Sequence, residues 1–224
     1  MTYLDTVITQ EFTAAELPAA VRAALGKPLR RAATLTQLAV VGALACLPAE
    51  RRTLPTALLW QTRSGPRAET LALLEEVCNG TAEPMPYDFL ATQPAIAAAQ
   101  LKPFLPGLHS ATCLPLADAT MANWSLLLSL ADHWLNSGRY AQVLCAQLDH
   151  ADDLASGHWL ALSAAPLENS LASLHLSEVT PGEALADASD FPACLDHWLA
   201  AESSGHLYLQ SAASRKLAVE FARI

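Results

Sequence analysis

One cysteine of the chain stands where a nucleophile could act. Cys113 follows a short apolar run and precedes Pro115, and a thiolate there could attack an acyl thioester. A reactive thiol needs a neighbouring cation or a helix N-terminus to lower its pKa, and the nearest titratable residue in the sequence is His109. We therefore favour a buried thiol at position 113, with an acyl-transferring nucleophile as the alternative.

A serine offers a second nucleophile. Ser64 stands in the segment Thr62-Arg-Ser-Gly65, directly after an apolar run that predicts a strand. Hydrolytic serines on such turns occur in the pattern G-x-S-x-G, and the first glycine is missing here. A hydrolytic role for Ser64 remains an alternative, but the motif does not support it.

Metal and nucleotide sites are not predicted. The only cluster of histidines and carboxylates is formed by His150, Asp152, Asp153 and His158, without a thiolate and without HExxH spacing, so a solvated loop is the favoured interpretation. The nine glycines are widely spaced, and the closest pair is Gly65 and Gly80. This spacing excludes both GxGxxG and P-loop motifs, so we expect no cofactor and no metal.

Composition limits the functional classes further. The 224 residues are 52% hydrophobic and 16% charged, which excludes a disordered chain. The formal net charge of -9 and the scarcity of lysine argue against binding to nucleic acid or to anionic membrane surfaces. The most apolar run, residues 38–47, is too short to cross a bilayer and does not resemble a secretory signal. Five cysteines without CxxC spacing indicate reduced thiols, and we expect a cytoplasmic protein.

Hydrophobic periodicity predicts helices and strands in alternation. This order favours an α/β fold with a mostly parallel, five-stranded type of sheet, helices on both faces and an antiparallel edge, in a single domain over residues 1–224. The tail, residues 207–221, is expected to be a strand followed by a helix. Residues 3–9 are expected to form a weak strand or a turn. The expected strands are residues 56–61, 111–114, 142–148, 159–164 and 171–176, and the expected helices are residues 13–25, 34–46, 69–78, 94–101, 123–136 and 191–202.

Six segments, taken in order, resemble the N-terminal half of β-ketoacyl synthases, and most closely the short chain-length-factor-like members of that family. The similar region covers roughly residues 29–153, and the tail with Trp198 and Arg223 is also similar. The segments are Leu29-Arg-Arg31, LLWQTRSGPRAETLALLEEV (58–77), Pro84-Met-Pro-Tyr-Asp-Phe89, Ser110-Ala-Thr-Cys-Leu114, Asn136-Ser-Gly138 and QVLCAQLDHADD (142–153).

The resemblance implies a thiolase-like half fold without the family's catalytic groups. In active members a nucleophilic cysteine opens the helix that ends at the position of Gly138; here that place falls at about Met121, and a thioether cannot form an acyl thioester. The catalytic histidines of the family belong to its C-terminal half, which this chain is too short to contain in full. The Ser64 loop also lacks the family's acidic residue, because Pro66 and Arg67 stand there.

By this resemblance the chain is expected to be a non-catalytic, chain-length-factor-like subunit. Its partners would be a catalytic ketosynthase and an acyl carrier protein, in polyketide or fatty-acid-like biosynthesis of the aryl polyene type. The family forms dimers, of one or of two kinds of chain, through the strand before the nucleophile helix. The corresponding interface residues here would be Ser110, Ala111, Thr112, Cys113 and Leu114.

Overall fold

A computed structural model describes residues 1–80, 83–116, 122–180, 182–201 and 205–224. Its strands are β1 (Thr2–Thr13), β2 (Thr56–Thr62), β3 (Leu108–Pro115), β4 (Gln142–Ala151), β5 (Leu154–Ser163), β6 (Ala172–Glu178), β7 (His206–Gln210) and β8 (Leu217–Arg223). Its helices are α1 (Glu16–Leu25), α2 (Thr34–Cys46), α3 (Arg67–Asn79), α4 (Pro86–Ala91), α5 (Pro94–Ala99), α6 (Trp124–Asn136) and α7 (Phe191–Ala200), with a 3-10 turn η1 (Ala49–Arg51).

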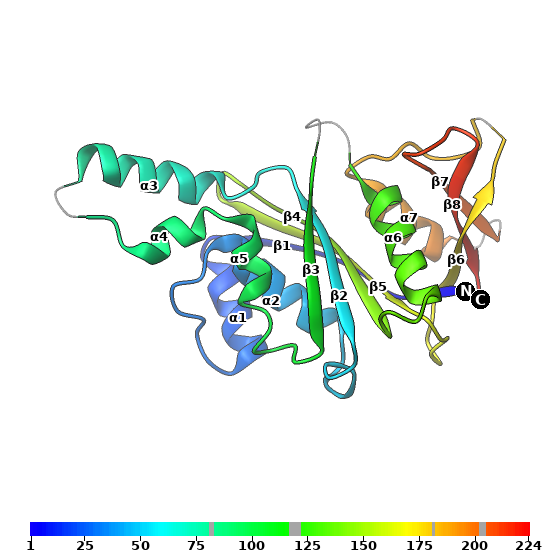
Figure 1. The fold of residues 1–224 in the computed structure, drawn as a ribbon, viewed down its shortest axis with the longest axis horizontal. Helices are drawn as coiled ribbons and strands as arrows, with labels where there is room; N and C mark the ends of the chain where they lie inside the picture. Colours follow the sequence, from blue (N-terminus) through cyan, green and yellow to red (C-terminus); the bar gives the residue numbers. More distant parts are fainter. Residues whose placement is uncertain (81–82, 117–121, 181, 202–204) are drawn as a thin grey trace.

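The strands form one mixed sheet in the order β3-β2-β4-β5-β1-β6-β8-β7. The α/β class and the helices on both faces are confirmed (Figure 1). Among the strands of the described residues, only β3–β2 and β2–β4 pair in parallel, so the expected mostly parallel sheet is matched only in part. The antiparallel portion is more than an edge, because β4 and β5 form a hairpin whose two-residue turn is Asp152-Asp153.

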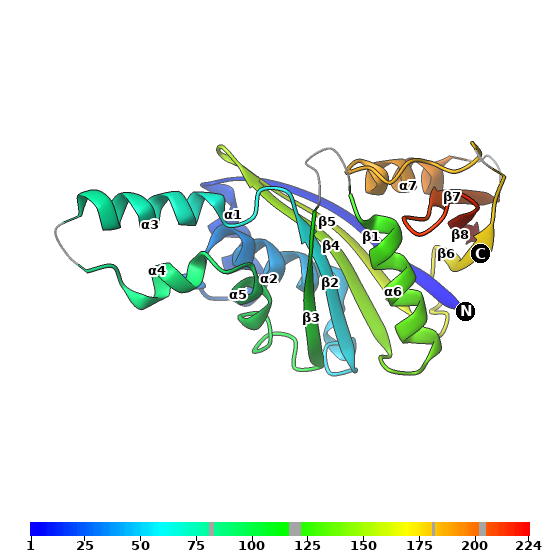
Figure 2. The ribbon, with the colours of Figure 1, turned by 45° about the horizontal axis from the view of Figure 1, so that its top comes forward.

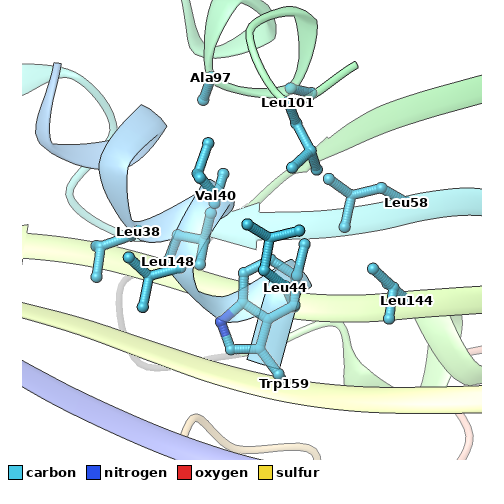
Figure 3. Close-up of a cluster of buried hydrophobic side chains, with 14 of the residues drawn as sticks. Leu38, Val40, Leu44, Leu58, Ala97, Leu101, Leu144, Leu148 and Trp159 are labelled. Atoms are coloured by element: carbon cyan, nitrogen blue, oxygen red, sulfur yellow. The ribbon is translucent and has the colours of Figure 1, made fainter. Parts of the chain in front are cut away.

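Helices α1, α2 and α5 cover one face of the sheet (Figure 2). The predicted helix at residues 34–46 is confirmed residue for residue, and it is buried on nearly every side. The side chains of α2 pack with leucines of β2 and β4 around the Trp159 indole (Figure 3). Gly42 makes this packing possible, since a methyl group there would lie 2.0 Å from the Trp159 Nε1 atom.

Helices α6 and α7 lie against the other face of the sheet. They are placed between the end of the sheet that begins with β3 and the end formed by β6, β8 and β7 (Figure 1). Alternation along β4 divides its side chains between the two cores: Leu144 and Leu148 face α2, whereas Val143 and Cys145 face α6. All are fully buried, which confirms the predicted central strand at residues 142–148.

Helices α3 and α4 extend away from the body of the molecule as an arm (Figure 1). Neither helix has a buried residue. The apolar residues that predicted a helix near 69–78 are therefore turned largely to solvent, with Leu71 58% and Val77 59% exposed. The short helix α4 was not predicted, because its proline-rich surroundings resemble a loop.

One expectation near the chain ends was wrong, and another was too short. The tail is a hairpin of β7 and β8 rather than strand and helix; Val219 and Phe221 of β8 enter the α6–α7 core, and pairing with both β6 and β7 overrides the helix propensity of this segment. The weak strand at residues 3–9 is the twelve-residue strand β1, paired with β5 and β6. Helix α1 begins at Glu16, whose carboxylate accepts hydrogen bonds from the backbone N–H and the hydroxyl of Thr13.

Candidate functional site

Three buried side chains link the carboxyl ends of β2 and β4 to the start of α6. Gln61 and Gln147 are register partners in the parallel β2–β4 pair, and Gln61 Nε2 donates to Gln147 Oε1 over 3.0 Å. Gln147 Nε2 donates in turn to Asp149 Oδ2 over 2.9 Å. The side-chain Oε1 atom of Gln61 accepts the backbone N–H of Asn123 over 2.7 Å, which ties the chain entering α6 to the sheet. Buried amides satisfied in this way fix the geometry of the strand ends.

Asp149 holds the loop after β2. One oxygen accepts the backbone N–H of Arg63 and of Ser64, the latter over 3.0 Å, and the Arg63 guanidinium lies 3.0 Å from the other oxygen. Burial acts to raise the pKa of Asp149, but the hydrogen bonds from Ser64, Gln147 and Arg63 outweigh it and leave the pKa below its usual value. The carboxylate is therefore a structural anchor, already saturated with donors.

Another carboxylate caps the N-terminus of α6. Asp187, from the loop before α7, accepts the backbone N–H of Trp124 over 3.0 Å and that of Ser125 over 2.9 Å, together with the Ser125 hydroxyl over 2.6 Å. Burial raises the pKa of Asp187, partly offset by these hydrogen bonds. A helix N-terminus attracts anions, and here the protein's own side chain occupies that position.

The position expected for the nucleophile, Met121, lies outside the described residues. Helix α6 begins three positions later, at Trp124, with Asn123 before it. The expected helix at residues 123–136 is otherwise confirmed. The identity of residue 121 is a fact of sequence, and its thioether has no nucleophilic acyl chemistry.

Cys113 lies on the edge strand β3 and is half-buried. Burial raises the pKa of its thiol, so the protonated, unreactive form is favoured. The thiol expected to be buried is therefore partly exposed, and its raised pKa disfavours the thiolate that acyl transfer needs.

Ser64 has its hydroxyl engaged in the loop. Its Oγ accepts the backbone N–H of His150 over 2.8 Å and lies 3.2 Å from the carbonyl of Gly65, to which it donates. A nucleophilic serine needs a base that takes its proton. The hydroxyl of Ser64 instead forms hydrogen bonds with backbone groups and with the Thr62 hydroxyl. The geometry gives Ser64 a role in shaping the loop.

The histidine and carboxylate cluster is divided by the hairpin of β4 and β5. Asp152 and Asp153 are exposed in the turn, while His158 points to β1, with its Nδ1 atom 3.2 Å from the Thr9 hydroxyl. Burial is the main cause that lowers the pKa of His158. Among the described residues, no three histidines, cysteines or carboxylates are arranged to hold a metal ion.

His150 belongs to a hollow of about 380 Å³ beside this loop. The hollow lies between the β4 end and the start of α3 and is lined by Ser64, Arg67, Ala68, Leu71, His150, Ala151 and Asp152. It contains one fixed cation and one carboxylate, and its nucleophile candidate is already hydrogen bonded. We assign it no catalytic role.

The expected interface strand, β3, is one of the two edge strands of the sheet. β3 pairs in parallel with β2 and ends the strand order, so its other edge carries backbone groups free of the sheet's ladder. Ala111 is exposed, and Ser110, Thr112, Cys113 and Leu114 are partly exposed. A strand edge that pairs with no further strand of its own sheet is the feature that strand pairing across an interface uses.

Sequence reasoning did not identify Asp187 or the Gln61–Gln147 pair. Asp187 reaches α6 from a loop 62 positions away, and no local pattern marks that contact. The two glutamines gave a weak signal, because each is a polar residue at the end of an otherwise apolar strand. Among the described residues, no helix is both long enough and apolar enough to span a bilayer.

The sequence matches no family profile and no curated relative, but its fold is similar to solved ketosynthase complexes. A ketosynthase in complex with its chain length factor from Xenorhabdus doucetiae superposes with a TM-score of 0.58 at 15% identity, covering 99% of each chain. The ishigamide ketosynthase/chain length factor gives 0.58 at 14% identity, over 91% of this chain and 84% of the other. A type II polyketide synthase ketosynthase with its acyl carrier protein gives 0.58 at 11% identity, over 100% and 99%. The chain therefore has the ketosynthase-like, thiolase-like fold, and the likeness extends well beyond residues 29–153.

Proposed function

We propose that this chain is a non-catalytic, chain-length-factor-like subunit that associates with a catalytic ketosynthase. In this role residues 1–224 form a single ketosynthase-like domain of a cytoplasmic assembly, which works with an acyl carrier protein in polyketide or fatty-acid-like biosynthesis, with aryl polyenes as the product class. The observation that carries the proposal is the Asp187 carboxylate on the N-terminus of α6, within a fold shared with ketosynthase complexes.

The α6 N-terminus matters because active ketosynthases would place their nucleophile there, as the sequence resemblance implies. A helix N-terminus lowers a thiol's pKa and favours an anion. At the N-terminus of α6 the Asp187 carboxylate already accepts a backbone hydrogen bond, and residue 121 supplies no thiol. Cys113, with its raised pKa, and Ser64, with its hydroxyl engaged, offer no replacement.

The first expected result is that the chain alone forms no acyl-enzyme. We expect intact-mass spectrometry to show the unmodified chain after incubation with acyl carrier protein thioesters, because residue 121 is a methionine and burial raises the pKa of the Cys113 thiol. The Cys113→Ala variant serves as the matched control for adventitious acylation. A stoichiometric acyl adduct that disappears in Cys113→Ala would contradict the proposal and favour an acyltransferase.

The second expected result is that proline in β3 breaks association. Successive residues of an edge strand direct their N–H groups alternately inward and outward, so either Thr112 or Ala111 donates across the proposed interface. We expect Thr112→Pro or Ala111→Pro to weaken binding to the ketosynthase by about tenfold or more while the fold survives, since proline is tolerated on sheet edges. Of the two variants, the one at the residue whose N–H points toward β2 removes a hydrogen bond within the sheet, and it is expected to lower the stability of the fold more.

Analytical ultracentrifugation with the ketosynthase encoded in the same gene cluster measures this effect. Thr112→Val is the matched control, because it changes the side chain and keeps the backbone donor. If both proline variants remain folded and bind with unchanged affinity, β3 is not the interface.

A further inference from the structure

One carboxylate of β8 lies on the face of the sheet that points away from α6 and α7. Side chains of β8 alternate between the two faces, and the residues on either side of Glu220 enter the α6–α7 core. Glu220 is the register partner of His175 in β6 and of Tyr208 in β7, and His206 stands two residues before Tyr208 on the same face. We call these four residues the Glu220 cluster. It spans the last three strands of the sheet, β6, β8 and β7 (Figure 1).

Each oxygen of Glu220 contacts a histidine from a different neighbouring strand. The Oε2 atom lies 3.2 Å from Nε2 of His175, and the Oε1 atom lies 2.7 Å from Nδ1 of His206. The Tyr208 hydroxyl donates to Oε1 over 3.5 Å, and the Tyr208 ring stacks on the His206 ring with 6.3 Å between the centroids. The carboxylate thus joins β6 and β7 to β8 through side chains, in addition to the backbone hydrogen bonds of the sheet.

Solvent reaches the histidines of this cluster but hardly reaches the carboxylate. The side chains of His175 and His206 are 44% and 55% exposed, whereas that of Glu220 is 11% exposed. Burial acts to raise the pKa of Glu220, but the neighbouring side chains, both histidines among them, outweigh burial and leave the pKa below its usual value. Glu220 is therefore ionised throughout the range in which histidines ordinarily gain and lose a proton.

The tyrosine of the cluster stays a hydrogen-bond donor over the same range. Burial, followed by the negative charges of Glu220 and Glu183, raises the pKa of the Tyr208 hydroxyl, which therefore keeps its proton. Glu183, from the loop after β6, adds a second negative charge on the Tyr208 side of the cluster. Of the residue types in the cluster, histidine is the one that ordinarily changes its charge between about pH 5 and 8.

Strand β7 also holds the loop that caps α6. The carbonyl of Tyr208 accepts the backbone N–H of Leu185 over 2.8 Å, and the backbone N–H of Gln210 donates to the carbonyl of Leu185 over 2.8 Å. Two residues after Leu185, the Asp187 carboxylate accepts the backbone hydrogen bonds at the start of α6. Strand β7 therefore connects the Glu220 cluster to that cap.

We propose that the Glu220 cluster is an acid-strengthened clamp: protonation of His175 and His206 tightens β6, β8 and β7 together and, through β7, secures the loop that caps α6. A charged imidazolium forms a stronger hydrogen bond with a carboxylate than a neutral imidazole does. The two histidines lie on opposite sides of β8, on strands about 10 Å apart, so the attraction of each to the adjacent carboxylate exceeds their mutual repulsion. The added stability is present at mildly acidic pH and is lost as the pH rises and the histidines lose their protons. This inference stands on the fold alone and goes beyond the proposed function.

Hydrogen exchange of the β8 backbone amides at about pH 6 and about pH 8 tests the clamp. After correction for intrinsic exchange rates, we expect protection in the unmodified chain to be about fivefold higher at the lower pH, as two partly exposed ion pairs would give. Glu220→Gln keeps the shape and an acceptor but removes the charge, and it is expected to lose this increase. His175→Gln/His206→Gln is expected to lose it as well, with the carboxylate retained. The matched control is Glu178→Gln, which makes the same change on an exposed carboxylate at the end of β6 and is expected to keep the full increase.

The outcomes of this experiment do not depend on a ketosynthase. An increase in the unmodified chain and in Glu178→Gln that is absent from both cluster variants supports the clamp. Equal protection of β8 at the two pH values in the unmodified chain overturns it, and so does an increase that persists in Glu220→Gln, because other groups would then cause it. The Leu185 amide reports the connection to the α6 cap: its protection is expected to rise together with that of β8, and a Leu185 amide that does not respond overturns that connection.

Discussion

Replacing Val143 by Asp is expected to unfold the protein at neutral pH. This is the largest effect that we expect from a single substitution. Val143 is fully buried in β4, between Ala57 of β2 and Leu162 of β5, and it faces the apolar core around α6. An unpaired carboxylate in such a place costs several kcal/mol, against a total stability of about 5–15 kcal/mol. Circular dichroism with thermal melting measures the result.

Two further variants keep this test informative. Val143→Ala removes only methyl groups and is expected to lower the free energy of unfolding by about 2 kcal/mol while the fold remains. Ala151→Asp places the same carboxylate at the exposed end of the same strand and is expected to change stability by less than about 0.5 kcal/mol. A cooperatively folded Val143→Asp variant of wild-type stability would show that β4 is not central.

Replacing Asp149 by Asn destabilises the protein by about 3 kcal/mol at neutral pH, because an amide cannot accept all the donors that the carboxylate accepts. The Asn side chain would leave backbone N–H groups of Arg63 and Ser64, or the Arg63 guanidinium, without a full partner. The exposed turn residue offers a matched control, since Asp153→Asn makes the same chemical change and is expected to be nearly neutral.

The pH dependence of this effect has a definite sign. The folded-state pKa of Asp149 lies below its ordinary value of 3.8, so the folded protein favours the ionised form. Its contribution to stability is complete above that value and is lost as the pH falls through the folded-state pKa. Urea denaturation should show a constant gap between the wild type and Asp149→Asn at neutral and mildly acidic pH, narrowing only below about pH 3.8. A gap that is absent at pH 7 would remove Asp149 as the anchor of the loop.

Local pattern predicted the buried elements of the fold well. The apolar run of α2, the strand β4 and the helix α6 are each placed within a few residues, because burial on both sides leaves an unambiguous apolar signature. β1 and β8 were harder, because threonines and charged residues interrupt them and long-range pairing decides their structure. The antiparallel pairing of β4 with β5 was not predicted. The aspartates within residues 149–153 suggested a loop, whereas this segment is the end of β4 and a two-residue turn.

The candidate site was predictable only in part. The sequence marked the absence of a thiol at position 121 and the short strand of Thr112 and Cys113, and the structure places that strand at the sheet edge. The capping of α6 by Asp187 depends on a contact between loops far apart in sequence, so no periodicity signals it.

Sedimentation velocity of this chain with the cluster-encoded ketosynthase tests the central claim most directly. Each protein is run alone and then in an equimolar mixture at micromolar concentration. The proposed role predicts that the mixture sediments as one species whose mass includes one copy of each chain, and that this chain alone shows no such species. Two independent boundaries in the mixture, each identical to that of the separate protein, would contradict the proposal that this chain is a ketosynthase partner.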